Sequence, residues 1–315
     1  MISTSSSMKY RRYQVAAYPE GNQMDDLRLA MTLMTLLSVA SFLGVRRLCA
    51  NAGPRVLDAA AAALVLIVGV YIRFVWGQLW IVRWIPLSSV VILANWFPVL
   101  LGVLAAVLWQ RMQSHSIPRR IPIQLLLVGA TVWSEIYVIP RNPPECRNEW
   151  IEPTVAMPFR ICLQTTPYTC SAASAATILD SLGIPSSEKE MAELCLTGEG
   201  TTWLGLYHGL SIRLRGTGFG VEFFEGNLTD LDVATANFPV LLCCKLSDTI
   251  DKANPNYRER SGWIPGIAHS TVLFGRVETV YAVGDPSQEF LELWSKQDVA
   301  NLWTGQGLRI VTTAR

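Results

Sequence analysis

The sequence predicts a helical membrane region followed by an α+β domain, and three observations support this prediction. Half of the 315 residues are hydrophobic and only 16% are charged, a composition that suits a membrane protein better than a soluble enzyme. Long apolar runs lie before residue 141, and the hydrophobic pattern after it has the short periods of packed helices and strands. In that later part, helices come first and antiparallel strands follow, which is typical of an α+β fold.

Charge divides the chain at the same place. Residues 1–140 carry 12 Lys/Arg and 5 Asp/Glu, a balance of +7, while residues 141–315 carry 14 and 20, a balance of −6. There is no basic stripe with interleaved aromatic residues, which leaves no case for nucleic acid as a partner. The predicted parts are a polar N-terminal tail (1–28), a transmembrane region (29–140), a proline-rich linker (141–159) and the α+β domain (160–315).

Four apolar segments predict about four transmembrane helices, so a lipid bilayer is an expected partner. Leu29–Val45 runs 17 residues without a charge, which is just enough to span a bilayer core of about 30 Å as a helix. The other segments cover about Val56–Trp76, Pro86–Trp109 and Ile121–Ile139. The alternative, a buried helical core, is disfavoured by the short basic loops between the segments. Glu135 is either a functional intramembrane carboxylate or, because it lies near a segment's end, a side chain at headgroup level.

The side of the membrane on which the α+β domain lies follows from the arginines of the loops. The first and third loops each hold three arginines, whereas the middle loop has only Arg83. By the positive-inside rule these two loops are cytoplasmic, which places both termini outside. Basic residues in the tail and after the last segment favour the opposite placement, so both stay open with a lean to the extracytoplasmic one.

The pattern after residue 160 predicts short helices and then strands. Ser187 and Glu190 have the spacing of a capping box, and Thr201 or Thr202 can cap the next helix. The expected elements are helices over 170–183, 187–196 and 202–214, a strand over 221–225, a helix over 229–237, a strand over 240–246, a polar loop over 247–267, strands over 269–274 and 279–284, a helix started by residue 295, and a strand over 308–311.

A candidate nucleophile begins the first of these helices. Pro167 blocks a helix before Thr169, Thr169 can cap, and Gly183 supplies a stop, so the helix is predicted to begin at Cys170. A thiol at a helix N-terminus faces unpaired amide groups and the positive end of the dipole, which lowers its pKa and favours the thiolate. Gln164 lies six residues upstream, where its side-chain amide can stabilise an oxyanion beside the backbone amide of the cysteine.

The chain has only three histidines from which a base can be chosen. His115 lies in a loop between two membrane segments, and His208 lies opposite the apolar face of its helix, which predicts a solvated surface histidine. His269 opens a strand, and Asp285 closes the next one. If these strands form a hairpin that turns around residues 275–278, both residues are equidistant from its centre and form a cross-strand hydrogen bond. A core histidine and a turn aspartate are the alternative.

These residues also carry a resemblance to a known family. The region from about Arg160 to Ile310 resembles the papain-like, double-glycine-leader (bacteriocin-processing) cysteine peptidases. The resemblance implies a papain-like fold with a Cys170, His269 and Asp285 triad and Gln164 as the oxyanion residue. It also implies a peptide or protein substrate and a bacterial cell membrane, and a cytosolic peptidase domain is common in the family. Trp303-Thr-Gly305 resembles a further family feature.

Two departures from the family pattern are visible, and one domain is missing. Ser171 follows the nucleophile where the family usually has glycine, and Ser287-Gln-Glu289 has no glycine soon after Asp-Pro. No GxxxxGK[ST] motif occurs, so the ATP-binding domain of a transporter is absent and a separate transporter or secretion subunit is a candidate partner.

The function expected from the sequence is a membrane-anchored cysteine peptidase, with a leader or precursor peptide as a candidate substrate. The alternatives are a non-catalytic peptide-binding or membrane-complex module with the same fold, and acyl or amide transfer from the same thioester. No cofactor or metal is required, because the seven cysteines form neither a CxxC motif nor a Cys/His cluster. Cys243 and Cys244 are expected to be small buried residues, and the pairing of these two and of Cys146, Cys162 and Cys195 stays open.

Overall fold

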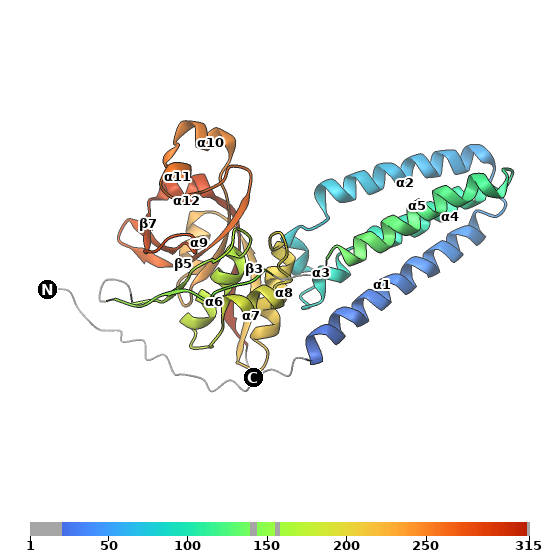
Figure 1. Cartoon of the computed structure of the whole chain (residues 1–315). Helices are drawn as coiled ribbons and strands as arrows, with labels where there is room; N and C mark the ends of the chain where they lie inside the picture. The colour runs from blue at the N-terminus through green and yellow to red at the C-terminus, as the bar shows by residue number, and fades with distance from the viewer. Residues whose placement is uncertain (1–20, 139–143, 155–157, 314–315) are drawn as a thin grey trace. The chain divides into compact units, whose positions relative to one another are not determined.

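The structure, a computed structural model, describes residues 21–138, 144–154 and 158–313 (Figure 1). The chain divides into a helical unit, Pro19–Arg141, and a second unit that contains Asn142–Arg315. Helix α1 (Gly21–Leu48) includes the end of the predicted polar tail, whose first 20 residues lie outside the described part.

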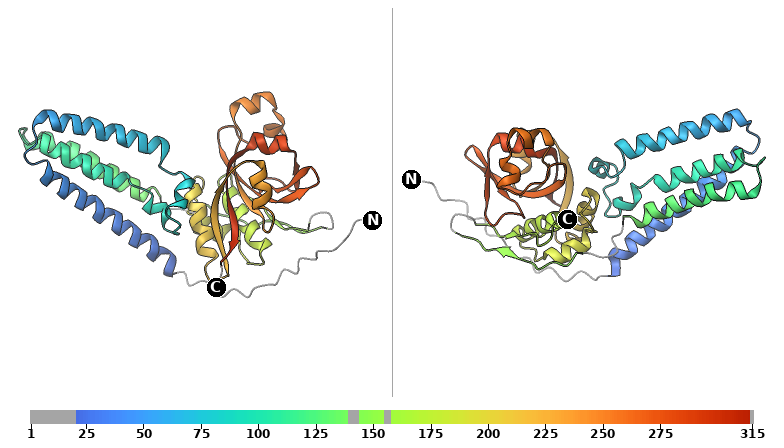
Figure 2. Two further views of the ribbon diagram at one scale, coloured as in Figure 1. Left: turned by 180° about the vertical axis from the view of Figure 1, so that it is seen from behind. Right: turned by 45° about the horizontal axis from the view of Figure 1, so that its top comes forward.

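The helical unit consists of long helices joined by short connections. They are α1, α2 (Pro54–Phe74), α4 (Phe97–Arg111) and α5 (Ile117–Ile136), with the 3₁₀ helix η1 (Leu79–Arg83) and the short α3 (Val90–Leu93) between α2 and α4. Helix α4 packs against α1, α2 and α5. Figures 1 and 2 show the α1–α2 and α4–α5 connections at the same end of this unit. Gly102 lets α4 approach α1 closely, because a Cβ there would lie 2.7 Å from the backbone oxygen of Ser38.

Three helices in the described part of the chain are long and apolar enough to cross a membrane, Asp25–Leu48, Pro54–Phe74 and Val90–Arg111. The fourth predicted segment is helical over most of its length, as α5, but it does not reach the apolar composition of the other three. The sequence of α5 explains this, because Arg119 and Arg120 lie in its first turn and Glu135 near its end. The third of these candidate spans, Val90–Arg111, is interrupted between α3 and α4. There the Tyr71 hydroxyl donates to Ala94 O (2.7 Å) and accepts from Trp96 N (2.9 Å).

After a short strand pair, the second unit continues with helices and then with an antiparallel sheet, which confirms the predicted order of helices before sheet. Helices α6 (Cys170–Ser181), α7 (Glu188–Leu194) and α8 (Trp203–Arg213) precede the sheet. The six-stranded sheet has the order β3-β8-β4-β5-β6-β7, and each neighbouring pair is antiparallel. Its strands are β3 (Phe219–Glu225), β4 (Val240–Lys245), β5 (Ala268–Val277), β6 (Val280–Gly284), β7 (Glu292–Trp294) and β8 (Trp303–Thr312).

The remaining elements of this unit are short. They are the strand pair β1 (Trp150–Ile151) and β2 (Ile161–Cys162), and helices α9 (Leu228–Ala234), α10 (Asp248–Ala253), α11 (Asn256–Glu259) and α12 (Lys296–Leu302). Three of these features differ from the sequence prediction. The polar loop over 247–267 contains α10 and α11, the unpredicted strands β1 and β2 pair before α6 with β1 inside the predicted linker, and β7 is an extra edge strand. Strands and helices of so few residues leave no hydrophobic period in the sequence.

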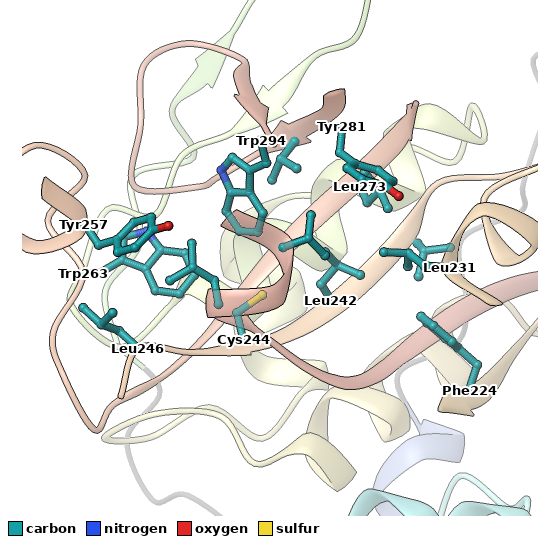
Figure 3. Packing of buried hydrophobic residues seen from close by; sticks show 14 residues of the cluster. Phe224, Leu231, Leu242, Cys244, Leu246, Tyr257, Trp263, Leu273, Tyr281 and Trp294 are labelled. Atoms are coloured by element: carbon teal, nitrogen blue, oxygen red, sulfur yellow. The ribbon is translucent and has the colours of Figure 1, made fainter. Parts of the chain in front are cut away.

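The sheet separates two layers of side chains around strands β4 and β5. Paired residues of neighbouring strands point to the same face, so Leu242 and Cys244 share one face with Thr271 and His269. That face holds the hydrophobic cluster drawn in Figure 3, which includes Leu242, Cys244, Leu246, Tyr257, Trp263, Leu273, Tyr281 and Trp294. Ser270 lies on the opposite face, which α6 covers. The N-terminus of α6 therefore lies against the start of β5.

Candidate active site

Helix α6 begins at Cys170, as the sequence predicts. Thr169 takes the N-cap position, but its side chain does not cap the helix; its hydroxyl donates to Thr166 O at 3.1 Å instead. The predicted side-chain cap is therefore wrong, because Thr166 lies closer to that hydroxyl in the preceding turn. The helix amides remain directed at the nucleophile position, which favours a negative charge on the sulfur.

His269 and Asp285 are hydrogen-bonded through Nε2 and Oδ1 at 2.8 Å. Asp285 is completely buried, and its Oδ1 also accepts from the backbone amide and the hydroxyl of Ser287, at 2.8 and 2.7 Å. Burial by itself would raise the pKa of this carboxyl group, but His269 and Ser287 hold the pKa below its usual value. An ionised carboxylate only accepts, so Nε2 of His269 carries the proton and Nδ1 is the nitrogen left for chemistry.

The pKa values of Cys170 and His269 shift in opposite directions. Burial would raise the pKa of the Cys170 thiol, but His269, the backbone amide of Ser270 and the Ser171 hydroxyl lower the pKa further than burial raises it. Burial would lower the pKa of His269, yet Asp285 and Cys170 raise it to about 10. Between these two pKa values the thiol is deprotonated and the imidazole is protonated. These directions favour a thiolate–imidazolium pair in which Nδ1 of His269 carries the second imidazole proton.

The strand register that joins His269 to Asp285 differs from the predicted one. The β5–β6 turn lies at Glu278 and Thr279, between the paired residues Val277 and Val280, so its centre is later than residue 277. A bulge between Leu273 and Gly275 then shifts the pairing by one residue. The predicted direct pairing is therefore wrong. His269 and Asp285 still meet, because Asp285 lies just beyond the end of β6 and occupies a diagonal position within reach of the imidazole.

Trp263 completes the carboxylate site, and no sequence pattern predicted this role. Its indole Nε1 donates to Oδ2 of Asp285 at 3.1 Å, and its ring packs edge-on against His269 with 4.7 Å between centroids. The 247–267 segment holds it in place. Gly266 N donates to Leu246 O at 2.8 Å, and the Trp263 amide donates to Tyr257 O at 3.1 Å. Both oxygens of Asp285 are thus hydrogen-bonded, and the imidazole is shielded on one side.

We expect Trp263→Phe to lower kcat/KM about tenfold or more, because a hydrogen bond to a buried charge is lost while an aromatic ring stays at this position. The matched control is Trp294→Phe, since Trp294 lies in the same cluster but donates to Glu292 instead, at 2.8 Å. Steady-state peptide cleavage measures both variants. Equal losses of kcat/KM in the two variants would show that the activity depends on packing in this cluster and not on the hydrogen bond to Asp285.

The backbone of Gln164 is fixed beside Asp285. Its amide donates to Pro286 O at 2.8 Å. The next residue, Thr165, is held through its amide and hydroxyl by the two oxygens of the buried Glu188, both at 2.7 Å. The side-chain oxygen of Gln164 is buried and has no hydrogen-bond partner in the described parts of the chain. No hydrogen bond there joins this side chain to Cys170, so the structure fixes the backbone of Gln164 without showing the contact that its predicted role needs.

The other two histidines lie on other elements. His115 follows α4 in the helical unit. His208 is completely buried, so the predicted surface position is wrong. The reason is that α8 packs on more than one side, against α7, α6 and β3. On the non-apolar face of α8, Gly205 and Gly209 allow the helix to approach Cys195 closely. A pair of glycines four residues apart is the sequence signal that could have indicated this burial.

The cysteines are unpaired, and two of them behave as the sequence predicts. All seven are free thiols. Cys243 and Cys244 are completely buried, which confirms the expectation for these two, and burial raises the pKa of both. In the described residues, no group of three or more His, Cys, Asp or Glu could hold a metal ion.

Comparison with known proteins gives matches among solved structures alone. No family profile and no curated protein matches the chain. The peptidase domain of Streptococcus ComA, a bifunctional ABC transporter of a quorum-sensing pathway, aligns at 20% identity and a TM-score of 0.38, over 48% of this chain and 96% of that one. The Streptococcus mutans ComA peptidase domain aligns at 18% identity and a TM-score of 0.33, over 48% and 98%. A double-glycine-motif protease from an AMS/PCAT transporter, solved with its leader peptide, aligns at 15% identity and a TM-score of 0.36, over 56% and 97%.

Proposed function

We propose that this protein is a membrane-anchored cysteine peptidase in which Cys170 is the nucleophile, His269 the acid–base group and Asp285 the residue that orients it. The observation that carries the proposal is the hydrogen bond of His269 to a completely buried, fully hydrogen-bonded carboxylate. Placed next to a cysteine at a helix N-terminus, this pair has the composition and charge of an activated thiol nucleophile.

The chemistry divides peptide hydrolysis into two steps. In the first, the Cys170 thiolate attacks the peptide carbonyl carbon and the carbonyl π electrons move to oxygen; Nδ1 of His269 then protonates the leaving amine as the C–N bond breaks. In the second, neutral His269 takes a proton from water, the resulting hydroxide attacks the thioester, and the thiolate leaves. This returns the site to a thiolate and an imidazolium. If an amine replaces water in the second step, the same site performs acyl transfer.

A direct test uses the purified full-length protein in detergent micelles and a pool of peptides of defined sequence. We expect cleavage products with free carboxyl termini, together with labelling of Cys170 by a thiol-directed probe located by mass spectrometry. Peptides joined to an added amine, in place of free carboxyl termini, would identify a transferase. A Cys170 that is no more reactive than an ordinary thiol would favour a non-catalytic peptide-binding module.

We propose that the side chain of Gln164 turns toward the reacting carbonyl and stabilises the oxyanion when substrate is bound. Its support is the anchored backbone and a side-chain amide that makes no hydrogen bond within the described residues, so that its N–H groups are left for a substrate oxygen. Gln164→Ala should lower kcat on the order of 10²–10³-fold with a smaller change in KM, because such a donor acts mainly in the transition state. Gln288→Ala is the control, since Gln288 holds Ser261 O at 2.7 Å. A Gln164→Ala enzyme with an unchanged kcat would place the oxyanion elsewhere.

We propose that the second unit lies on the extracytoplasmic side of a cell membrane, with α5 as a fourth span. The arginine-rich first and third loops belong to one end of the helical unit, where Gln110 donates to Arg46 O at 2.6 Å and Arg111 pairs with Asp58 at 2.6 Å. Such a cluster marks the cytoplasmic end. A reporter active only outside the cytoplasm, fused after Arg315, should give signal, and the same reporter inserted at Asn51 should not. Signal from a cytosol-specific reporter at residue 315 would reverse the assignment.

A further inference from the structure

Two buried serines directly follow the proposed nucleophile and base. Ser171 comes after Cys170 in α6, and Ser270 comes after His269 in β5. Their hydroxyl oxygens lie 2.8 Å apart, with Ser171 only 3% exposed and Ser270 completely buried. A second bond joins the same two elements, because the Ser174 hydroxyl donates to Ser270 O at 2.9 Å. The relative position of α6 and β5 is thus fixed at the residues next to the reacting groups.

The direction of the hydroxyl contact follows from what each serine can donate to. A hydroxyl has one proton to donate, and leaving a buried one without an acceptor costs free energy. Either oxygen can be the donor in this contact, but the Ser171 side chain also interacts with Cys170, so the arrangement that gives both protons an acceptor has Ser270 donating to Ser171. The proton of Ser171 then remains for another acceptor. The sulfur of Cys170, in the same first turn of α6, is the adjacent group that can take it.

We propose that Ser171 and Ser270 are positioning residues of the thiol site, in which the Ser270 hydroxyl orients the Ser171 hydroxyl and Ser171 donates to the Cys170 thiolate. This inference rests on the proposed function, since it assigns to Cys170 the role of nucleophile. It also gives the departure from the family pattern at residue 171 a chemical role. A glycine there would leave the thiolate with one donor fewer, and hydrogen bonds to charged groups are among the stronger ones.

The groups that titrate around the thiol come from three elements. His269 in β5 faces the thiol, with Asp285 behind it after β6, and Cys244 in β4 lies close enough to interact with both Cys170 and Asp285. Burial raises the pKa of the Cys244 thiol beyond the range in which it ionises near neutral pH. The pH dependence of Cys170 therefore reports its pairing with His269 and the donors that hold the thiolate, of which the Ser171 hydroxyl is one.

The experiment measures the rate of iodoacetamide alkylation of Cys170 against pH, with the full chain in detergent micelles and mass spectrometry to locate the label. Removing the hydroxyl in Ser171→Ala should raise the midpoint of this profile by about one pH unit, the shift expected for losing a hydrogen bond to a charge. Ser171→Gly, which suits a helix N-terminus, serves as a second variant in case alanine perturbs folding. Ser270→Ala should raise the midpoint less, and the double variant should match Ser171→Ala, because Ser270 acts through Ser171.

Ser174→Ala is the matched control, because it breaks the second bond between α6 and β5 without removing a donor to the sulfur. It should lower the thermal midpoint of unfolding and leave the alkylation midpoint unchanged. The inference is overturned if Ser171→Ala and Ser171→Gly keep the wild-type alkylation midpoint, or if Ser174→Ala shifts it equally. A wild-type Cys170 that alkylates only near pH 8.5–9, as an ordinary thiol does, would instead overturn the proposed function itself.

Discussion

Replacing Cys170 by alanine should abolish peptide cleavage, with a loss on the order of 10⁶-fold in kcat, comparable to that for the nucleophile of other hydrolases. The reason is that no other thiol is prepared for the reaction. Burial and the nearby Glu188 and Glu193 raise the pKa of Cys146 to about 11, and Cys195 is completely buried. Labelling by a thiol-directed probe at neutral pH should disappear together with cleavage.

The matched control for this result is Cys146→Ala, which removes a half-buried thiol from the same unit. It should keep both the cleavage rate and the label on Cys170. Cleavage that survives in Cys170→Ala would require a different nucleophile, and loss of cleavage in both variants would point to a general requirement for free thiols. A thermal unfolding measurement on each variant checks that the fold is retained.

Replacing His269 by alanine should have the second largest effect, a loss in kcat of at least about 10²–10⁴-fold, the usual contribution of an acid–base group. Two consequences of the substitution act together. The leaving amine loses its proton donor, and the pKa of Cys170 rises because the neighbouring cation is gone. The double variant Cys170→Ala/His269→Ala should be no less active than Cys170→Ala, because residues that act as one unit do not add.

His115→Ala provides the control for His269, since His115 lies in the helical unit. It should retain the wild-type kcat. A shift of the Cys170 alkylation profile in His269→Ala separates loss of the ion pair from a general loss of structure. If that profile stays at the wild-type position, another cation must stabilise the thiolate and His269 is not its partner.

The candidate nucleophile could be predicted from the sequence because its position depends on local signals. Pro167 prevents an earlier helix start, and Gly183 follows the end of α6 in a left-handed conformation, with φ of +72°. Such signals act within a few residues of the element that they limit. The order of helices and strands could be predicted for the same reason, since each element has its own hydrophobic period.

The contacts between elements were harder to predict from the sequence. The meeting of His269 with Asp285 was expected from a wrong register, because neither the bulge after Leu273 nor the position of the turn leaves a clear sequence signal. Trp263 was missed since nothing local distinguishes a tryptophan in a polar loop from one that donates to a buried carboxylate. His208 was placed at the surface because the helical pattern shows one apolar face and does not show how many neighbours a helix has.

The bulge in β5 determines which changes in chain length the second unit can tolerate. Side chains alternate between the two faces of a strand, so a register shift of one residue exchanges the faces. Deleting Phe274, the extra residue of the bulge, would leave Leu273–Val283 and Gly275–Ala282 as consecutive pairs and keep His269 on its face. Deleting a residue between His269 and the bulge would instead carry His269 to the face covered by α6 and point it away from Asp285. Length changes at the Glu278–Thr279 turn, by contrast, leave the pairing of the strands intact. Related chains that keep this site should therefore vary in length at the turn, while the distance from residue 269 to the bulge stays constant.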